Sequence, residues 1–304
     1  MRRRGQGGMT AYFFYGSLRH LPLLRAVLGR EVNWQPGRLD DHRVVSLPGD
    51  RWPTLTPAPG ESVTGILVEE LSEAEAERLN YYRAKVTLTL REVVGPEGAV
   101  EALTYLPPMR PGAVEWHYES WARDWGPLVT AMAEDIMAGM GDLPAERDSA
   151  RTPQLYGRAA SRLRAIADGR PVRGEAPADA VELHARRHPY ANYFAVEEYD
   201  VAFRRFDGGM SDVVTRAVFI SGDAATVMPY DPVRDRVLLV EQFRIGAYAR
   251  GDRQPWLLEP IAGRIDAGET PEATARREAK EEAGLTLDRL IEVGRYYSSP
   301  GCVA

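Results

Sequence analysis

The sequence predicts an α+β protein with two domains. A chain of 304 residues is long enough to bury two ordinary cores. Short β-rich runs separated by turn-forming residues occur near the start of the chain and again in its last third. Helical patterns and stretches rich in Gly, Pro and charge lie between them. We therefore expect one domain over residues 10–142, a helical linker over 143–189 and a second domain over 190–304.

The composition excludes several classes of protein. The 38 basic and 44 acidic residues give a net charge of −6, which repels nucleic acid. The sequence has no apolar run long enough to cross a bilayer. Its single cysteine, Cys302, cannot form an internal disulfide, which fits a reducing compartment. We predict a cytoplasmic protein with neither a nucleic-acid nor a membrane partner.

In the first domain, five β-rich runs predict a small barrel or curled sheet: residues 12–15, 44–47, 65–68, 85–90 and 102–106. Turns are expected at residues 47–50 and 57–60, because both segments combine proline with glycine. Ser72 and Glu75 have the spacing of a capping box, which predicts a helix over residues 72–80.

Helical spacing also predicts helices over residues 118–140 and 155–166. One apolar stripe of the first helix is expected to be core: Trp121, Trp125, Leu128, Met132 and Ile136. Further along, His184 and His188 have the i,i+4 spacing of a metal-binding pair on a helix. No third ligand is evident, so we expect surface histidines.

The second domain is expected to contain strands over residues 194–206, 213–220, 224–230, 237–243 and 257–262, with a hairpin turn at 231–235. Its most distinctive segment is residues 263–285. Thr270 suits the N-cap of a helix, and Gly284 suits the left-handed position that ends one. With proline favoured in the first turn, the helix is predicted from Pro271 to Ala283.

Three carboxylates share one edge of that helix, because Glu281 and Glu282 follow Glu278 by three and four residues. Like charges this close repel unless a hard cation lies between them, and Mg²⁺ takes oxygen ligands of this kind. A solvated charged face is the alternative for any such helix. The full pattern favours the metal site: Gly263, Glu269 and the run Arg277-Glu278-Ala279-Lys280-Glu281-Glu282-Ala283-Gly284-Leu285.

This pattern resembles the Nudix box at each of its defining positions. The resemblance implies a loop–helix–loop against a mixed sheet, within an α/β/α sandwich. It implies Mg²⁺ as the cofactor, with Mn²⁺ as the alternative, and Glu278 and Glu282 as metal ligands. Glu281 corresponds to a further glutamate near the metal, and Arg277 to an arginine that orients the carboxylates.

Flanking segments look like those of the ADP-ribose pyrophosphatases: residues 229–235, 240–244, 256–263 and 298–301. By that likeness the carbonyl of Ala262 also binds metal, and Arg216, Arg244 and Gly301 contact the substrate. A surface ion pair is the alternative role for either arginine. The implied reaction is attack of a metal-activated water on one phosphorus of ADP-ribose, which yields AMP and ribose 5-phosphate. The likeness also implies a homodimer.

Members of that family continue beyond the position of Ala304 through further strands, a loop with a catalytic glutamate and a closing helix. We therefore expect a chain that is truncated at its C-terminus. The general base and part of the sheet are expected to lie beyond residue 304.

The N-terminal domain resembles the gamma-glutamylcyclotransferase-like (AIG2-like) fold through residues 12–18, 52–55 and 63–67. The resemblance implies a β-barrel whose substrate pocket is formed by Tyr15, Gly16, Ser17 and Leu18. Active members use a glutamate as the acid and base where this sequence has Arg83, which stays protonated at neutral pH. We therefore expect a non-catalytic binding or assembly role.

Two alternatives stay open at this point. One is a regulatory protein that binds ADP-ribose or a related nucleotide without cleaving it. The other is a gamma-glutamyl cyclotransferase that acts through the N-terminal domain, and Arg83 argues against it. The sequence does not rank ADP-ribose against other nucleoside diphosphate sugars.

Overall fold

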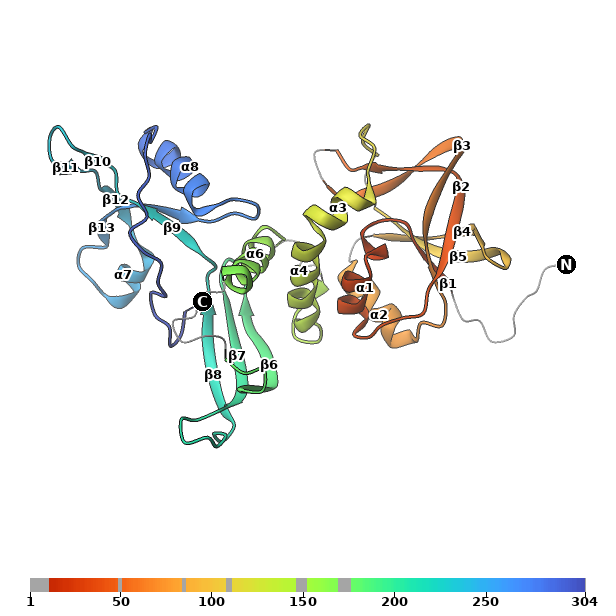
Figure 1. Ribbon diagram of the computed structural model, residues 1–304, viewed down its shortest axis with the longest axis horizontal. Coiled ribbons are helices and arrows are strands. Elements are labelled where there is room, and N and C mark those ends of the chain that lie inside the picture. The colour runs from red at the N-terminus through yellow and green to blue at the C-terminus, as the bar shows by residue number, and fades with distance from the viewer. Residues whose placement is uncertain are drawn as a thin grey trace. The chain divides into compact units, whose positions relative to one another are not determined.

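The computed structural model describes residues 11–48, 51–83, 86–107, 111–145, 152–168 and 176–303. The chain divides into two units, residues 1–155 and 156–304, which we describe separately (Figure 1). Among the helices of the described ranges, none is both long enough and apolar enough to cross a membrane. Parts of three predicted segments lie outside the described residues: Gly49 and Asp50 of a turn, Lys85 of a strand, and residues 146–151 and 169–175 of the linker.

The first unit contains a closed barrel, as the sequence predicts. Its elements are β1 (Ala11–Phe14), η1 (Ser17–Arg19), α1 (Leu21–Leu28), β2 (Gln35–Ser46), β3 (Pro53–Val68), α2 (Glu73–Tyr82), β4 (Thr87–Gly95), β5 (Gly98–Leu106), α3 (Tyr118–Asp124) and α4 (Gly126–Ala138). The strands follow the order β1-β3-β2-β4-β5. A parallel pairing of β1 with β5, in which Ala11 lies beside Ala102, closes the barrel (Figure 1).

Alternate residues of the first strand form part of the barrel core. Ala11, Phe13 and Tyr15 are all buried in one cluster, since side chains two apart on a strand share a face. Phe13 is completely buried, which stabilises the fold by roughly 1.5–3 kcal/mol. Its ring lies so close to Gly65 that a Cβ there would come within 2.6 Å of it. Only glycine fits at that position of β3.

The two longest barrel strands correct one prediction. The sequence predicts a turn at residues 57–60, but they lie inside β3, where Pro57 pairs with His42 of β2 and the next three residues span the irregularity in the ladder. The register shifts at Asp40 and His42, where a bulge forms, and the Asp41 carboxylate accepts a hydrogen bond from the Gly60 amide at 2.8 Å. A bulge tolerates prolines that lack an N–H group for the ladder.

The predicted helices of this unit form with one interruption. The capping box of α2 is present, because Ser72 Oγ accepts from the Glu75 amide and Glu75 accepts from the Ser72 amide. The predicted helix over residues 118–140 is two helices, α3 and α4, which separate at Trp125. Pro127 lies in the first turn of α4, where its missing N–H leaves no intrahelical bond unmade.

The second unit combines small antiparallel sheets with three helices in the described ranges. Its elements are α6 (Thr152–Asp168), β6 (Val181–Ala191), β7 (Ala195–Phe203), β8 (Val214–Ile220), β9 (Ala224–Val227), β10 (Tyr230–Asp231), β11 (Arg236–Val237), β12 (Val240–Phe243), α7 (Ile245–Arg250), β13 (Trp256–Glu259), β14 (Ile261–Arg264) and α8 (Pro271–Ala283). The sheets are β6-β7-β8, β9-β14, β12-β13 and the predicted hairpin β10-β11. The division between the units falls within α6.

The prediction of a helical linker up to residue 189 is wrong at its end. Residues 181–191 form β6, which pairs with β7, so His184 and His188 lie on a strand. His188 is also not a surface residue, because its side chain is 5% exposed and lies 3.3 Å from a carboxylate oxygen of Glu197. Pairing with a later strand overrides the local spacing that predicted a helix.

Candidate active site

The helix α8 begins and ends where its capping residues predict. Thr270 Oγ1 accepts a hydrogen bond from the Ala273 amide at 3.2 Å, and Pro271 occupies the first turn. Gly284 ends the helix with φ of 67°, a left-handed conformation that side chains with a Cβ rarely adopt. The predicted range, Pro271 to Ala283, is confirmed.

One face of α8 packs on the two-stranded sheet β9-β14. Thr274, Ala275 and Ala279 are buried on that face, and two small alanines allow close approach to the sheet. Gly263 on β14 faces Glu278, and a Cβ at Gly263 would lie 1.8 Å from Glu278 Oε1. The carboxylate of Glu278 therefore occupies the space that any other residue at position 263 would fill.

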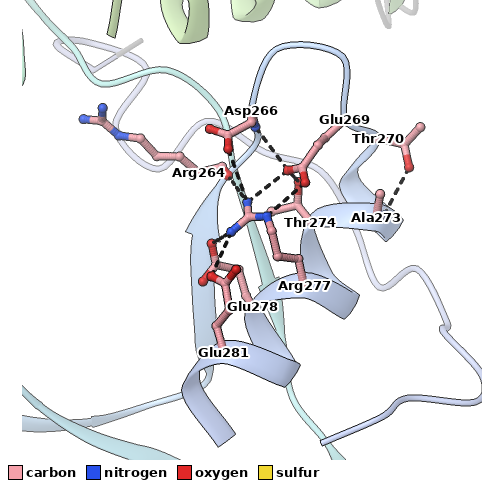
Figure 2. Close-up of polar contacts among 9 residues, drawn as sticks. All are labelled: Arg264, Asp266, Glu269, Thr270, Ala273, Thr274, Arg277, Glu278 and Glu281. Carbon is pink, nitrogen blue, oxygen red and sulfur yellow. Dashed lines mark hydrogen bonds and ion pairs between the residues drawn. The ribbon is translucent and has the colours of Figure 1, made fainter. Parts of the chain in front are cut away.

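Arg277 connects the loop before the helix to the glutamates on it (Figure 2). Its guanidinium donates to both oxygens of Glu269 at 2.9 Å and to the carbonyl oxygen of Arg264 at 3.1 Å. It also donates to Glu278 Oε1 at 2.6 Å and to Glu281 Oε2 at 3.2 Å. One planar cation thus holds three carboxylates in fixed positions.

Glu269 is the best-satisfied carboxylate of this cluster. Besides Arg277, the Thr274 hydroxyl donates to it at 2.8 Å and the Asp266 amide at 3.4 Å. The hydrogen bonds from Arg277 are the main cause that lowers the pKa of Glu269 to about 2, and they raise the pKa of Arg277 in turn. Glu269 is therefore a permanent anion at neutral pH, and Arg277 a permanent cation.

The three glutamates predicted on the edge of α8 accept hydrogen bonds from two different side chains. Glu278 and Glu281 contact Arg277, whereas Glu282 Oε1 accepts a hydrogen bond from Gln242 Nε2 on β12 at 3.0 Å. In the described ranges, no three His, Cys, Asp or Glu side chains are grouped to hold a metal ion. The predicted ligands include only two such side chains, with the carbonyl of Ala262 as the third donor.

The donor set nevertheless has the chemistry that a hard divalent cation requires. All three donors are oxygens, and the two carboxylates bring negative charge. Ala262 lies on β14 directly before Gly263, against which the Glu278 carboxylate lies. The chemistry of the residues present therefore fits a hard divalent cation.

Comparison with known proteins agrees with this geometry. Residues 221–302 match the family model of the NUDIX domain, and residues 12–123 match the model described as gamma-glutamyl cyclotransferase, AIG2-like. The chain carries a Nudix domain and an AIG2-like domain. The two family resemblances predicted from the sequence are thereby confirmed.

Curated relatives cover part of this chain. The ADP-ribose pyrophosphatase of Escherichia coli K12 is 48% identical over 121 residues, which are 40% of this chain and 57% of that protein. The protein of the same name from Haemophilus influenzae is 42% identical over 123 residues, with the same two shares. The GDP-mannose pyrophosphatase of Yersinia pestis is 38% identical over 112 residues, 37% of this chain and 56% of that protein. The chain thus spans a little over half the length of these relatives.

The three predicted substrate contacts of the Nudix domain form hydrogen bonds with residues outside the Arg277 cluster. Arg244 donates to both oxygens of Glu259, at 2.6 and 2.5 Å, and this pair bridges the ends of β12 and β13. Arg216 on β8 is exposed and donates to the Thr215 carbonyl. Gly301 lies in an exposed turn, whose next residue, Cys302, accepts a backbone hydrogen bond from Phe219 of β8. Their role as substrate contacts stays a prediction.

The sequence motif assigns no chemical function to two residues of the Nudix site, Glu269 and Gln242. Glu269 belongs to the recognised motif, and its spacing from Arg277 on a loop–helix unit could have indicated the pair. Gln242 lies 40 positions before Glu282, and no local pattern connects the two. Only the packing of β12 near α8 brings them together.

In the AIG2-like domain, the four predicted pocket residues line one pocket. Tyr15, Gly16, Ser17 and Leu18 are joined there by Phe13, Phe14, Pro53, Arg83 and Tyr105. The Tyr15 hydroxyl donates to the Tyr105 carbonyl at 3.0 Å, and a Cβ at Gly16 would lie 2.6 Å from the Pro53 ring. None of these described lining residues is a carboxylate, which the alternative cyclotransferase role would require as its acid and base.

Proposed function

We propose that the Nudix domain hydrolyses the diphosphate of a nucleoside diphosphate sugar, with ADP-ribose as the substrate and AMP and ribose 5-phosphate as the products. The observation that carries the proposal is the edge of α8 on which Glu278, Glu281 and Glu282 stand, fixed by Arg277 from one side and Gln242 from the other. Fixed carboxylates of this kind suit a metal-assisted attack on a phosphoanhydride.

The choice of ADP-ribose rests on the relatives. Those named ADP-ribose pyrophosphatase are 42–48% identical to this chain over the matched residues, and those named GDP-mannose pyrophosphatase are 38% identical. Both names describe cleavage of a nucleoside diphosphate linked to a sugar. The class of substrate thus has broader support than the particular sugar nucleotide.

Glu278 and Glu282, together with the carbonyl of Ala262, would hold the cation, and Mg²⁺ is the proposed ion with Mn²⁺ as the alternative. When bound, such a cation supplies charge neutralisation at the diphosphate and a water of lowered pKa. The protein's part is orientation. Arg277 holds Glu278 through Nη1 at 2.6 Å, so that carboxylate keeps one position while a substrate enters.

The test is Mg²⁺-dependent release of AMP from ADP-ribose by the full chain, with GDP-mannose as the competing substrate. The Glu278→Gln variant should lose at least about a hundredfold in rate, because it removes one charged oxygen donor from the metal site. Glu272→Gln is the matched control, since Glu272 lies exposed in the first turn of the same helix. It should keep the wild-type rate.

Two results would contradict the proposal. A wild-type rate in Glu278→Gln would remove the carboxylates of α8 from the chemistry. Calorimetric binding of ADP-ribose without any turnover in Mg²⁺ or Mn²⁺ would instead favour the alternative, a protein that recognises the nucleotide without cleaving it. A cytoplasmic location and a homodimer belong to the proposal, and light scattering of the purified chain tests the dimer.

A further inference from the structure

Each of the two glutamates proposed as metal ligands has one carboxylate oxygen that is already bonded to a protein N–H group. Glu278 Oε1 accepts from Arg277 Nη1 at 2.6 Å, and Glu282 Oε1 accepts from Gln242 Nε2 at 3.0 Å. Among the residues that the structure describes, no side chain or amide donates to Oε2 of either glutamate. Each carboxylate therefore has one engaged oxygen and one open oxygen.

The two donors come from different elements of the fold. Arg277 directly precedes Glu278 on α8, whereas Gln242 lies on β12 and pairs with Leu257 of β13. Four residues of β12 pair with four of β13, so the backbone that carries Gln242 is fixed by the ladder. The bond to Glu282 is the only hydrogen bond of the Gln242 side chain within the described ranges. Its geometry is thus set by the sheet and not by the helix.

Arg244 lies near the same carboxylate but bonds elsewhere. It shares a strand face with Gln242, two residues before it, and its Nε and Nη2 both donate to Glu259. The hydrogen bonds to Glu259 raise the pKa of Arg244, and the nearby charge of Glu282 raises it further. The donor to Glu282 is therefore a neutral amide, which engages one oxygen without cancelling the charge that a cation needs.

We propose that Gln242 is a positioning residue that makes the Nudix site prefer Mg²⁺ over Ca²⁺. By engaging Oε1 of Glu282, it leaves that carboxylate a single oxygen for the cation, as Arg277 does for Glu278. The inference rests on the proposed function, because it requires a cation at Glu278 and Glu282.

The two cations differ in how they use a carboxylate. Ca²⁺ takes roughly six to eight oxygens at about 2.3–2.6 Å and often binds both oxygens of one carboxylate, whereas Mg²⁺ requires a near-octahedral set at about 2.0–2.1 Å. To bind Ca²⁺ through both oxygens, Glu282 would have to give up its hydrogen bond to Gln242. Binding of Mg²⁺ through one oxygen keeps that bond. The amide therefore imposes a cost on Ca²⁺ that Mg²⁺ avoids.

The test measures metal binding by the full chain without any substrate. Mn²⁺ is the probe, and the electron paramagnetic resonance signal of free Mn²⁺ reports how much is bound. The site on α8 is identified as the Mn²⁺ binding that Glu278→Gln loses. Mg²⁺ and Ca²⁺ are then added in turn as competitors, which gives the ratio of their affinities at this site.

Gln242→Met keeps the length of the side chain and removes the amide. The affinity for Mg²⁺ should fall by about tenfold, the effect of losing an outer partner of a metal ligand. The affinity for Ca²⁺ should stay the same or rise, so the ratio should move towards Ca²⁺ by about tenfold. Gln254→Met is the matched control, because Gln254 is exposed between α7 and β13 and forms no side-chain hydrogen bond in the described ranges. It should keep the wild-type ratio.

Circular dichroism verifies that the variants fold. If Gln242→Met does not fold, Gln242→Asn replaces it, since its amide is one methylene short of Glu282 and the same shift is expected. An unchanged ratio would overturn the inference, and so would an equal loss of both affinities, which a merely structural residue would cause. Absence of saturable Mn²⁺ binding in the wild type would overturn it too.

The outcome is separable from the proposed hydrolysis. Release of AMP from ADP-ribose by the wild type, together with an unchanged ratio in Gln242→Met, would overturn the role of Gln242 and leave the hydrolase proposal standing. A shifted ratio in a chain that cleaves no nucleoside diphosphate sugar would support the role of Gln242 and contradict the proposed function.

Discussion

Arg277 shows why the residue type matters at one position of α8. A guanidinium has five N–H donors in one plane, and Arg277 uses them on Glu269, Glu278, Glu281 and the Arg264 carbonyl. Lysine has three donors on a single atom and cannot reach four acceptors at these positions. The positive charge of residue 277 is therefore not sufficient to hold the carboxylates, and the donor geometry of arginine is also needed.

Replacing Arg277 by lysine should lower the rate of Mg²⁺-dependent AMP release by about 10–100-fold, the usual effect of losing an outer partner of a metal ligand. The expected cause is a loosely held Glu278, so the concentration of Mg²⁺ needed for half-maximal rate should rise as well. Arg276→Lys is the control, because Arg276 faces the carbonyl of Asp288 and not the carboxylates. Equal rates in the two variants would show that a positive charge suffices.

The lowered pKa of Glu269 predicts a pH dependence of stability. Its pKa falls from 4.5 in the unfolded chain to about 2, so the ionised form is favoured by folding. The contribution is complete above pH 4.5, about 3 kcal/mol at most, and is lost as the pH falls towards 2. Glu269→Gln should therefore unfold at a lower temperature than the wild type at pH 6, and the difference should shrink at pH 3.

Scanning calorimetry at the two pH values measures this difference. Glu272→Gln, in the first turn of the same helix, controls for the loss of one acidic group. A gap between the wild type and Glu269→Gln that is as large at pH 3 as at pH 6 would contradict the ion-pair origin of the stability.

At the scale of elements, the helix α8 could be predicted to the residue because its signals are local. Thr270, Pro271 and Gly284 act within one turn of the positions they occupy. Dense apolar runs predict the barrel strands, whereas the prolines of residues 57–60 predict a turn, because the bulge that accommodates them depends on β2. The local sequence at these residues favours a turn, but their place between paired segments of β3 and β2 keeps them in the strand.

The same distinction applies to the candidate site. Glu278, Glu281, Glu282 and Arg277 are recognisable from spacing on one helix. The hydrogen bond from Gln242 to Glu282 and the strand β6 around His188 depend on contacts with distant segments, which spacing does not contain. Substrate contacts depend in addition on the shape of the ligand, so Arg216, Arg244 and Gly301 stay predictions.

The contact between β14 and α8 predicts an unusual effect of a small substitution. In Gly263→Ala the new Cβ would take the place of Glu278 Oε1, which lies 1.8 Å from that point. A flexible side chain can move aside, so the fold should tolerate the change while the carboxylate leaves its position. We expect AMP release to fall by about 10–100-fold, with little change in the unfolding temperature.

The control for this variant is Gly246→Ala. Gly246 lies in α7, and a Cβ there would meet nothing within 4 Å. This variant should keep the wild-type rate. Full activity of Gly263→Ala would mean that Glu278 works equally well from another position.

At the scale of the whole molecule, the two units should respond separately to destabilising changes. Each has buried residues of its own: Leu79 in the first unit is completely buried, and Glu197 in the second is 4% exposed. Burial raises the pKa of Glu197, but the neighbouring His188 and the hydrogen bonds from Arg186 and Tyr199 outweigh burial and hold its pKa well below the usual range. Domains with separate cores can unfold as separate cooperative units.

Leu79→Ala should destabilise only the first unit, by about 2–5 kcal/mol, through a cavity in its core. Glu197→Gln should destabilise only the second, by about 3 kcal/mol, because it leaves the partly buried Arg186 guanidinium without its bidentate partner. Tryptophan fluorescence and calorimetry during urea or thermal unfolding measure both. Five of the six tryptophans lie before residue 156 and only Trp256 lies after it, so fluorescence reports mainly on the first unit. A single transition that both variants shift by equal amounts would show that the units unfold as one.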